Sequence, residues 1–303
     1  MNHIVIFDIG KTNKKCFVFD EDYRIVWEKS AVLAETTDED GDPCEDLELL
    51  TRWIEETFED LLNNNRFTIR AADATTYGAS FVHLGADGKP VAPLYNYLKP
   101  FPQDLKAPFF KTYGGEEKLS LETASPSLGN LNSGLQLYWL KHRRPEVYKT
   151  IRNSLHLPQY VASLLHSMVH GASKYCSEPT SIGCHTMLWD FEQKDYHRWV
   201  KAEGINQKFP PFCPEKEETN GCYVGNGFHD SSAALIPYLT SFQEPFVLIS
   251  TGTWCISLNP FNTEPLTSEE LAQDCLCYLT ADGKPVKAAR YFGGHEHEQA
   301  VLK

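Results

Sequence analysis

Residues 4–19 read IVIFDIGKTNKKCFVF, and far downstream residues 246–258 read FVLISTGTWCISL. Each stretch is a short apolar run, then a turn that pairs a glycine with hydroxyl residues, then a second apolar run. This pattern predicts a β-hairpin whose turn carries polar chemistry. Because the N–H groups of such turns converge into an anion-binding concavity, two hairpins, one in each half of a molecule, are suited to holding a phosphate chain from both sides.

The composition favours a soluble globular chain. It has 303 residues, 42% of them hydrophobic, and a net charge of −13, which predicts about two domains. The acidic balance argues against a nucleic acid or an anionic membrane as the main partner. No apolar stretch approaches the roughly 20 residues of a spanning helix, and we expect no secretory leader. Nine cysteines lack the spacing of a disulfide framework, so we expect reduced thiols in a cytoplasmic protein, with a redox role as the alternative.

Strands and helices alternate along the chain, which predicts an α/β layer structure. Strands are expected over 4–9, 14–19, 23–28 and 67–76, and helices over 47–62, 131–140, 145–151, 158–166 and 231–239. A hairpin of 81–84 with 91–94 is expected around Asp87-Gly88, and an irregular proline-rich stretch over 93–108. The boundary is placed between a domain over 1–242 and a second over 243–303. The second stretch is shorter than a domain of 100–200 residues, so we expect it to be incomplete.

Residues 8–14 combine a carboxylate at a strand end with a glycine and several donors. Phosphoryl transfer needs this combination, because N–H, Lys and Thr groups hold phosphate oxygens while a carboxylate holds Mg²⁺ directly or through water. The alternative is an ordinary tight turn with surface lysines. A P-loop is not expected, because that motif needs a glycine where Val5 stands.

Residues 225–232, which read GNGFHDSS, place a His-Asp pair at the start of a helix. Asp230 suits an N-cap, a position at which Asp is favoured. It also suits a general base in a cleft where phosphate arrives. Its place shortly before the second hairpin favours the base.

Together these residues resemble the FGGY family of carbohydrate kinases, which has the ribonuclease H-like fold of actin and hexokinase. Among its members, the pattern is most similar to that of rhamnulokinases. The matching segments are Asp8-Ile9-Gly10, residues 75–81 (TTYGASF), residues 175–181 (YCSEPTS), His229-Asp230-Ser231 and residues 250–254 (STGTW).

The resemblance implies an ATP-dependent transfer of phosphate to a ketose, in which Asp230 accepts the proton of the attacking sugar hydroxyl. It implies that His229, Ser231 and Gly78 contact the sugar and that Asp8 orients Mg²⁺. The nucleotide contacts that it implies are Asp8, Gly10, Lys11, Thr12, Asn13, Lys14, Thr251, Gly252, Thr253 and Gln299. A homodimer is compatible with this reading.

Two departures from the rhamnulokinase pattern concern the sugar. Ser80 stands where an acidic residue is usual, and residues 95–100 (YNYLKP) replace a loop that usually carries an Asp and an Arg. The sugar is therefore expected to differ from L-rhamnulose, with L-fuculose or xylulose as alternatives. A second hypothesis is a catalytically silent sugar-binding or regulatory homologue, since the adenosine-binding segment of the family would lie beyond Lys303.

Overall fold

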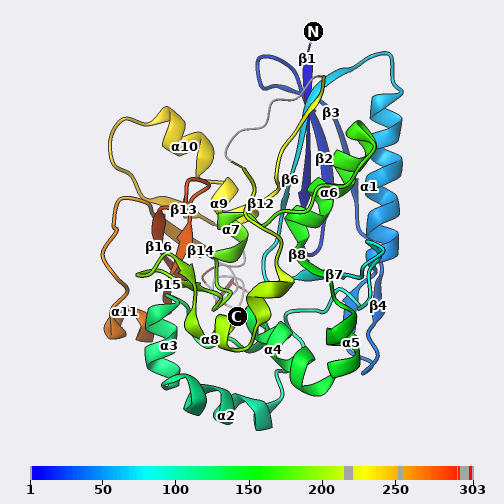
Figure 1. Ribbon diagram of the computed structural model, residues 1–303. Helices are drawn as coiled ribbons and strands as arrows, with labels where there is room; N and C mark the ends of the chain where they lie inside the picture. Colours follow the sequence, from blue (N-terminus) through cyan, green and yellow to red (C-terminus); the bar gives the residue numbers. More distant parts are fainter. Residues whose placement is uncertain (1, 215–220, 252–254, 292, 294–299, 302–303) are drawn as a thin grey trace.

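The computed structural model describes residues 2–214, 221–251, 255–291, 293 and 300–301. The two largest sheets, of six and four strands, lie in different lobes, and three two-stranded sheets accompany them (Figure 1). The strands are β1 (Asn2–Ile9), β2 (Lys14–Phe19), β3 (Ile25–Ala31), β4 (Glu35–Thr37), β5 (Pro43–Glu45), β6 (Thr68–Thr76), β7 (Phe81–Leu84), β8 (Asn153–His156), β9 (Trp189–Asp190), β10 (Asp195–Tyr196), β11 (Tyr223–Val224), β12 (Phe228–His229), β13 (Leu248–Ser250), β14 (Cys255–Asn259), β15 (Cys275–Leu279) and β16 (Pro285–Tyr291).

The helices lie between and around these sheets. They are α1 (Leu47–Leu62), α2 (Gln103–Tyr113), α3 (Glu116–Glu122), α4 (Ser133–Arg143), α5 (Pro145–Thr150), α6 (Leu157–His170), α7 (Pro179–Ile182), α8 (Arg198–Ala202), α9 (Asp230–Ala233), α10 (Ile236–Ser241) and α11 (Ser268–Ala272). Among the described helices, none combines the length and the hydrophobicity needed to traverse a bilayer.

The first sheet has the strand order β11-β6-β1-β2-β3, and β12 also pairs with β6. β1 and β2 are antiparallel with Ile9 opposite Lys14, which confirms the predicted hairpin. β6 runs parallel to β1 and places Thr75 opposite Asp8. β12 runs parallel to β6 and places His229 opposite Thr76. Three segments far apart in the sequence therefore end at the same edge of the sheet.

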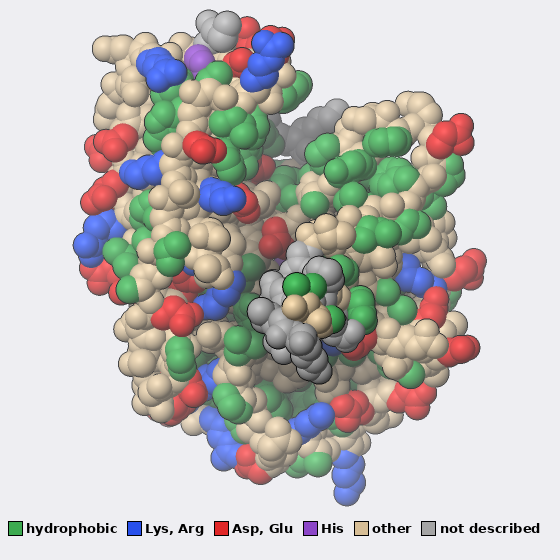
Figure 2. Space-filling view, turned by 180° about the vertical axis from the view of Figure 1, so that it is seen from behind, with side chains coloured by type: hydrophobic (Ala, Val, Ile, Leu, Met, Phe, Trp, Pro, Cys, Tyr) green, Lys and Arg blue, Asp and Glu red, His purple; other side chains and the backbone are tan. Residues whose placement is uncertain are grey.

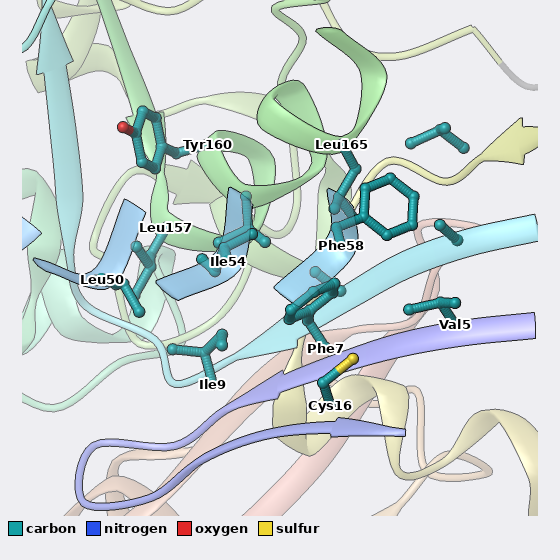
Figure 3. Packing of buried hydrophobic residues seen from close by; sticks show 14 of the residues in the cluster. Val5, Phe7, Ile9, Cys16, Leu50, Ile54, Phe58, Leu157, Tyr160 and Leu165 are labelled. Carbon is teal, nitrogen blue, oxygen red and sulfur yellow. The ribbon is translucent and has the colours of Figure 1, made fainter. Parts of the chain in front are cut away.

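The core of the first lobe follows from alternation along β1. Val5, Phe7 and Ile9 are fully buried, and they pack against Leu50, Ile54 and Phe58 of α1 and against Leu157 and Leu165 of α6 (Figure 3). α1 matches its predicted bounds. It begins where Asp46 accepts a hydrogen bond from the N–H of Leu49, and its buried residues recur at helical spacing. Because side chains of a strand alternate between faces, Asp8 lies on the face turned away from both helices.

The second lobe is a four-stranded sheet of order β13-β14-β16-β15. β13 and β14 are antiparallel, so the strands of the second predicted hairpin are confirmed. β15 contacts the first lobe directly, since the N–H of Cys277 donates to the carbonyl of Ala124 at 2.9 Å and Ser232 Oγ donates to that of Leu279 at 2.9 Å. A side chain on Gly183 would lie 2.3 Å from that of Leu279, so α7 packs closely on β15.

One prediction about local structure is confirmed in part and another is wrong. The turn around Asp87-Gly88 is present, since the N–H of Gly85 donates to the carbonyl of Lys89 at 2.8 Å and that of Val91 to the carbonyl of His83 at 2.9 Å. Residues 91–94 do not continue as a strand, however, and the strand that pairs with β7 is β8. The stretch predicted as irregular contains the start of α2, with Pro108 inside the helix. The pairing of β7 with β8 joins residues about seventy positions apart, and local sequence patterns do not reveal such distant partners.

The expectation that all thiols are reduced is also wrong at one pair. Cys176 and Cys213 form a disulfide, and the other cysteines are free. The N–H of Ser177 donates to the carbonyl of Pro211, and the N–H of Cys213 donates to that of Ser177, both at 2.8 Å. These bonds align two segments 37 residues apart, a pairing that cysteine spacing does not reveal.

Candidate active site

Asp8 marks the first side of the candidate site. Its carboxylate accepts a hydrogen bond from Thr75 Oγ at 3.3 Å, across the β1–β6 pairing. Burial raises the pKa of Asp8, the bond from Thr75 lowers it, and the negative charge of Asp230 raises it further. The two carboxylates, 222 positions apart in the sequence, therefore lie within electrostatic reach of each other.

The turn between β1 and β2 is tight. The N–H of Gly10 donates to the carbonyl of Asn13 at 2.9 Å, and a Cβ on Gly10 would lie 3.0 Å from that oxygen, so the position favours glycine. Thr12 and Asn13 are exposed at the tip. Their hydroxyl and amide groups are open to a ligand, and their contact with a phosphate stays a prediction.

The two lysines of this turn differ in their surroundings. Lys14 is buried, with its Nζ 2.7 Å from a Glu45 carboxylate oxygen and 2.9 Å from the carbonyl of Lys11. It holds the turn from inside, and its contact with a phosphate stays a prediction. Lys11 is partly exposed and pairs with Glu35 at 2.6 Å. Of the two ammonium groups, that of Lys11 is the one that a ligand can reach.

Asp230 stands between the lobes. It begins α9 directly after β12, and its side chain remains 42% exposed while that of His229 is 3% exposed. Burial is the main cause of the raised pKa values of Asp8 and Tyr97 in the first lobe and of Tyr278 in the second, and the charge of Asp230 adds to each of them. Figure 2 shows a groove between the two lobes, with acidic side chains visible at its floor. Asp230 is thus not the helix N-cap, which is His229.

Hydrogen bonds orient the Asp230 carboxylate. Oδ1 accepts the N–H of Ser231 at 2.6 Å and Ser231 Oγ at 3.3 Å, and it lies 3.4 Å from Nε2 of His229. Burial raises the pKa of Asp230, and the bonds from Ser231 oppose that shift. Burial lowers the pKa of His229 to about 4, so the imidazole is neutral at pH 7. The carboxylate is the charged partner of this pair.

Gly78 and His229, which the resemblance implies as sugar contacts, lie next to each other. A Cβ on Gly78 would lie 2.8 Å from Nε2 of His229 and 3.2 Å from the His185 ring. The next residue, Ala79, has φ of 60°, a left-handed conformation that is costly for a residue with a side chain. Gln136 holds this turn by donating to the Ala79 carbonyl at 2.6 Å.

Two residues of this pocket were not predicted. His185 follows α7, and its ring centroid lies 5.7 Å from that of His229; Tyr278 on β15 lies 5.4 Å from His229. Tyr278 brings the second lobe to the same point. No local signal marks these two residues, since one lies in a loop and the other in an ordinary buried strand.

Two buried carboxyl groups hold the segment that carries His229 and Asp230. Asp73 accepts the N–H of Gly227 at 2.9 Å, and burial raises the pKa of Asp73 to about 6. Glu178 accepts from Thr180 Oγ, which in turn accepts the N–H of His229 at 3.0 Å. Burial raises the pKa of Glu178 to about 8. Both groups fix the backbone that carries His229 and Asp230.

Gly78→Ala is expected to weaken sugar binding. The added methyl group would displace His229, and changes of this size in a pocket alter affinity by about 10–200-fold. Calorimetric titration with the preferred ketose measures the effect. Gly283→Ala is the control, because its φ of 74° strains the variant while no atom lies within 4 Å of the added carbon. Equal affinity of Gly78→Ala and the wild type would contradict the assignment of this pocket.

Gly225→Ala is expected to destabilise the protein by about 1–3 kcal/mol. The new Cβ would lie 2.0 Å from an Asp73 carboxylate oxygen, so the loop that leads to His229 must move. Urea unfolding measures the loss of stability. An unchanged midpoint would show that Asp73 does not hold this loop.

The second hairpin contributes less to the described site. Thr251 is exposed at the end of β13, whereas Gly252, Thr253 and Gln299 lie outside the described residues. Their predicted contacts with the nucleotide stay predictions.

Profiles of one protein family match most of the chain. The profile of the "FGGY family of carbohydrate kinases, N-terminal domain" matches residues 3–223, and that of "Carbohydrate kinase FGGY, C-terminal domain" matches residues 243–303. The chain belongs to the FGGY family of carbohydrate kinases. No curated protein matches the sequence significantly.

Solved structures of FGGY-type kinases share the fold. A carbohydrate kinase from Novosphingobium aromaticivorans superposes with a TM-score of 0.85 at 26% identity, covering 100% of this chain and 66% of that chain. A ligand-bound xylulose kinase from Lactobacillus acidophilus gives 0.76 at 16% identity, covering 95% and 59%. Plasmodium falciparum glycerol kinase with ADP gives 0.72 at 17% identity, covering 96% and 60%. The chain thus spans less than two thirds of the length of each of these three, and the fold predicted from the sequence is confirmed.

Proposed function

We propose that the protein transfers the γ-phosphate of ATP to a hydroxyl group of a ketose, with Asp230 as the general base. The observation that carries the proposal is the placement of Asp230. Its partly exposed carboxylate has a pKa raised by burial, and it lies within electrostatic reach of Asp8 on the strand that leads into the first turn. A base must meet an alcohol at the point where phosphate arrives, and this placement supports that role.

The remaining groups suit positioning rather than covalent chemistry. Ser231 fixes one carboxylate oxygen of Asp230 through its N–H, which leaves the other oxygen for the proton of the sugar hydroxyl. Thr12, Asn13 and Lys11 offer donors at the first turn. Phosphoryl transfer relies chiefly on such positioning and on stabilisation of charge.

Mg²⁺ fits this site. The pKa of Asp8 is raised chiefly by burial and further by the negative charge of Asp230, and a divalent cation relieves such repulsion while accepting oxygen ligands. Asp8 would hold the ion, directly or through water. When bound, the ion would neutralise phosphate charge.

The sugar is proposed to be a ketose other than L-rhamnulose. Residues 95–100 stand where the rhamnulokinase pattern carries an Asp and an Arg. In this chain the hydroxyl of Tyr95 donates to Glu39 at 2.5 Å. The ammonium group of Lys99 pairs with the carboxylates of Asp38, Asp40 and Asp42 at 2.6, 2.8 and 2.9 Å. These partners leave neither group free for a hydroxyl. L-fuculose and xylulose are the first candidates, and three of the similar structures are named as xylulose kinases.

A ketose panel with ATP and Mg²⁺ tests the proposal. We expect one ketose to raise ADP release at least about tenfold above the sugar-free rate and to yield a phosphorylated sugar visible by ³¹P NMR. Ketose binding without turnover would overturn the proposal in favour of the silent sugar-binding homologue. ADP release that is independent of every ketose would overturn it as well.

A further inference from the structure

Three metal-ligating side chains meet at the base of the sugar pocket. They are Cys184 and His185, which follow α7, and His229 at the end of β12, and one potential ligand atom from each lies within 4.8 Å of the other two. Cys184 and His229 are buried, and His185 is partly buried. The proposed sugar chemistry has no use for the thiol of Cys184.

Both histidines have a ring nitrogen that is available to bind a metal ion. Nδ1 of His185 lies 3.0 Å from the carbonyl of Leu131 and donates to it, so Nε2 carries the free lone pair. Metal-binding histidines characteristically donate their second ring nitrogen to a carbonyl in this way, which fixes the tautomer and the ring orientation. His229 has a buried Nδ1 without a hydrogen-bond partner in the described part of the chain. An orphaned nitrogen of this kind needs an explanation.

The surroundings of Cys184 suit a thiolate once a cation is present. Its Sγ donates to the carbonyl of Ser181 at 3.3 Å, and the backbone N–H groups of His185 and Ala79 favour the anionic form. Burial and then the negative charge of Asp230 are the stronger influences and raise the pKa of the thiol, so the group is protonated when no cation is bound. On coordination the S–H bond breaks, the proton passes to solvent and the sulfur pair binds the cation.

We propose that Cys184, His185 and His229 form a binding site for a zinc-type divalent cation. One thiolate and two imidazoles match the ligands of Zn²⁺ and exclude Mg²⁺, which prefers oxygen. The Asp230 carboxylate, 3.4 Å from Nε2 of His229, is placed to accept the proton of that nitrogen while Nδ1 binds the cation, and water would complete a fourfold set.

The site has a consequence for the proposed kinase. Because His229 is a predicted sugar contact and Asp230 the proposed base, a bound cation would exclude the ketose. Zn²⁺ would therefore act as an inhibitor that competes with the sugar. This consequence rests on the proposed function, whereas the metal site itself does not.

Titration of the protein with Co²⁺, in the presence of a non-thiol reductant, tests the site. We expect an absorption band from sulfur-to-cobalt charge transfer and its displacement by one equivalent of Zn²⁺. Cys184→Ser is expected to abolish the band and to weaken Zn²⁺ binding about 100-fold or more. Cys277→Ser is the matched control, because it also removes a buried thiol but lies outside the three-residue group. A band that persists in Cys184→Ser would overturn the proposal.

Wild-type protein provides the second measurement, which does not depend on the folding of a variant. X-ray absorption of the Zn²⁺-loaded protein should show one sulfur at about 2.3 Å and nitrogens at about 2.0–2.1 Å. A first shell of nitrogen and oxygen alone would place the metal elsewhere, for example on the His166–His170 pair of α6, and would overturn the site.

Ketose titration with and without Zn²⁺ separates the two proposals. Loss of ketose binding in the presence of Zn²⁺ supports both. A sulfur-containing zinc site that leaves ketose affinity unchanged would support the metal site and overturn the assignment of the sugar pocket.

Discussion

Replacement of Asp230 by Asn is expected to lower turnover by about 10²–10⁴-fold, the usual contribution of a positioned base. Asn has nearly the same shape and keeps an oxygen for the N–H of Ser231, but it cannot take a proton at neutral pH. Ketose affinity should change little, because the contacts with His229 and Gly78 remain. ADP release gives the turnover number, and calorimetry gives the dissociation constant.

A matched substitution distinguishes loss of the base from a general effect of charge. Asp195→Asn also removes one negative charge, but Asp195 is exposed and pairs with Lys201 on the surface. We expect the activity of Asp195→Asn to equal that of the wild type. If Asp230→Asn retained wild-type turnover as well, Asp230 would not be the base.

The free energy of unfolding is expected to fall by about 2 kcal/mol between pH 7 and pH 5.5. Burial lowers the pKa of His83 and His156 to about 3 and of His185 and His229 to about 4, against 6.5 in an unfolded chain. As the pH falls below 6.5, these four histidines bind protons in the unfolded state but not in the folded state. The stability that their neutral forms contribute above pH 6.5 is therefore lost on acidification.

Two buried carboxyl groups act in the opposite direction. The pKa of Asp73 is raised to about 6 and that of Glu178 to about 8, so the folded state binds protons there that the unfolded state has released. Their contribution grows on acidification and offsets part of the loss from the histidines. It is lost as the pH rises through the folded pKa values, so Glu178 lowers stability toward pH 8.5.

Urea unfolding at pH 5.5, 7 and 8.5 measures both effects. His83→Gln removes one buried imidazole that is not among the proposed catalytic groups. Its free energy of unfolding should therefore fall by about 1 kcal/mol less than that of the wild type between pH 7 and pH 5.5. Glu178→Gln keeps an oxygen for the N–H of Ser181. Relative to the wild type, its free energy of unfolding should rise by about 1 kcal/mol between pH 7 and pH 8.5. Unfolding free energies of the wild type that do not change from pH 5.5 to 7 would contradict the neutral state of the buried histidines.

Local patterns were sufficient for the elements of the first lobe. The two apolar runs on either side of the Gly10 turn predicted the hairpin, and they placed Asp8 near the end of its first strand. α1 was predicted to the residue because its apolar spacing coincides with a capping Asp46 and the stop at Asn63. The His229-Asp230 pair was also found from sequence, since a Gly-rich loop before a helix start is a local signal.

The amino-acid sequence by itself determined the two hairpins, the amphipathic helices and the kinase family, because these depend on residues close together in the chain. Only the tertiary structure decided that β7 pairs with β8, that Cys176 bonds to Cys213, and that His185 and Tyr278 enter the pocket beside His229. It also decided that Lys14 is buried against Glu45. Each of these contacts joins segments that are far apart in the chain. Their burial stabilises the fold, but it produces no periodic pattern of residues in the sequence.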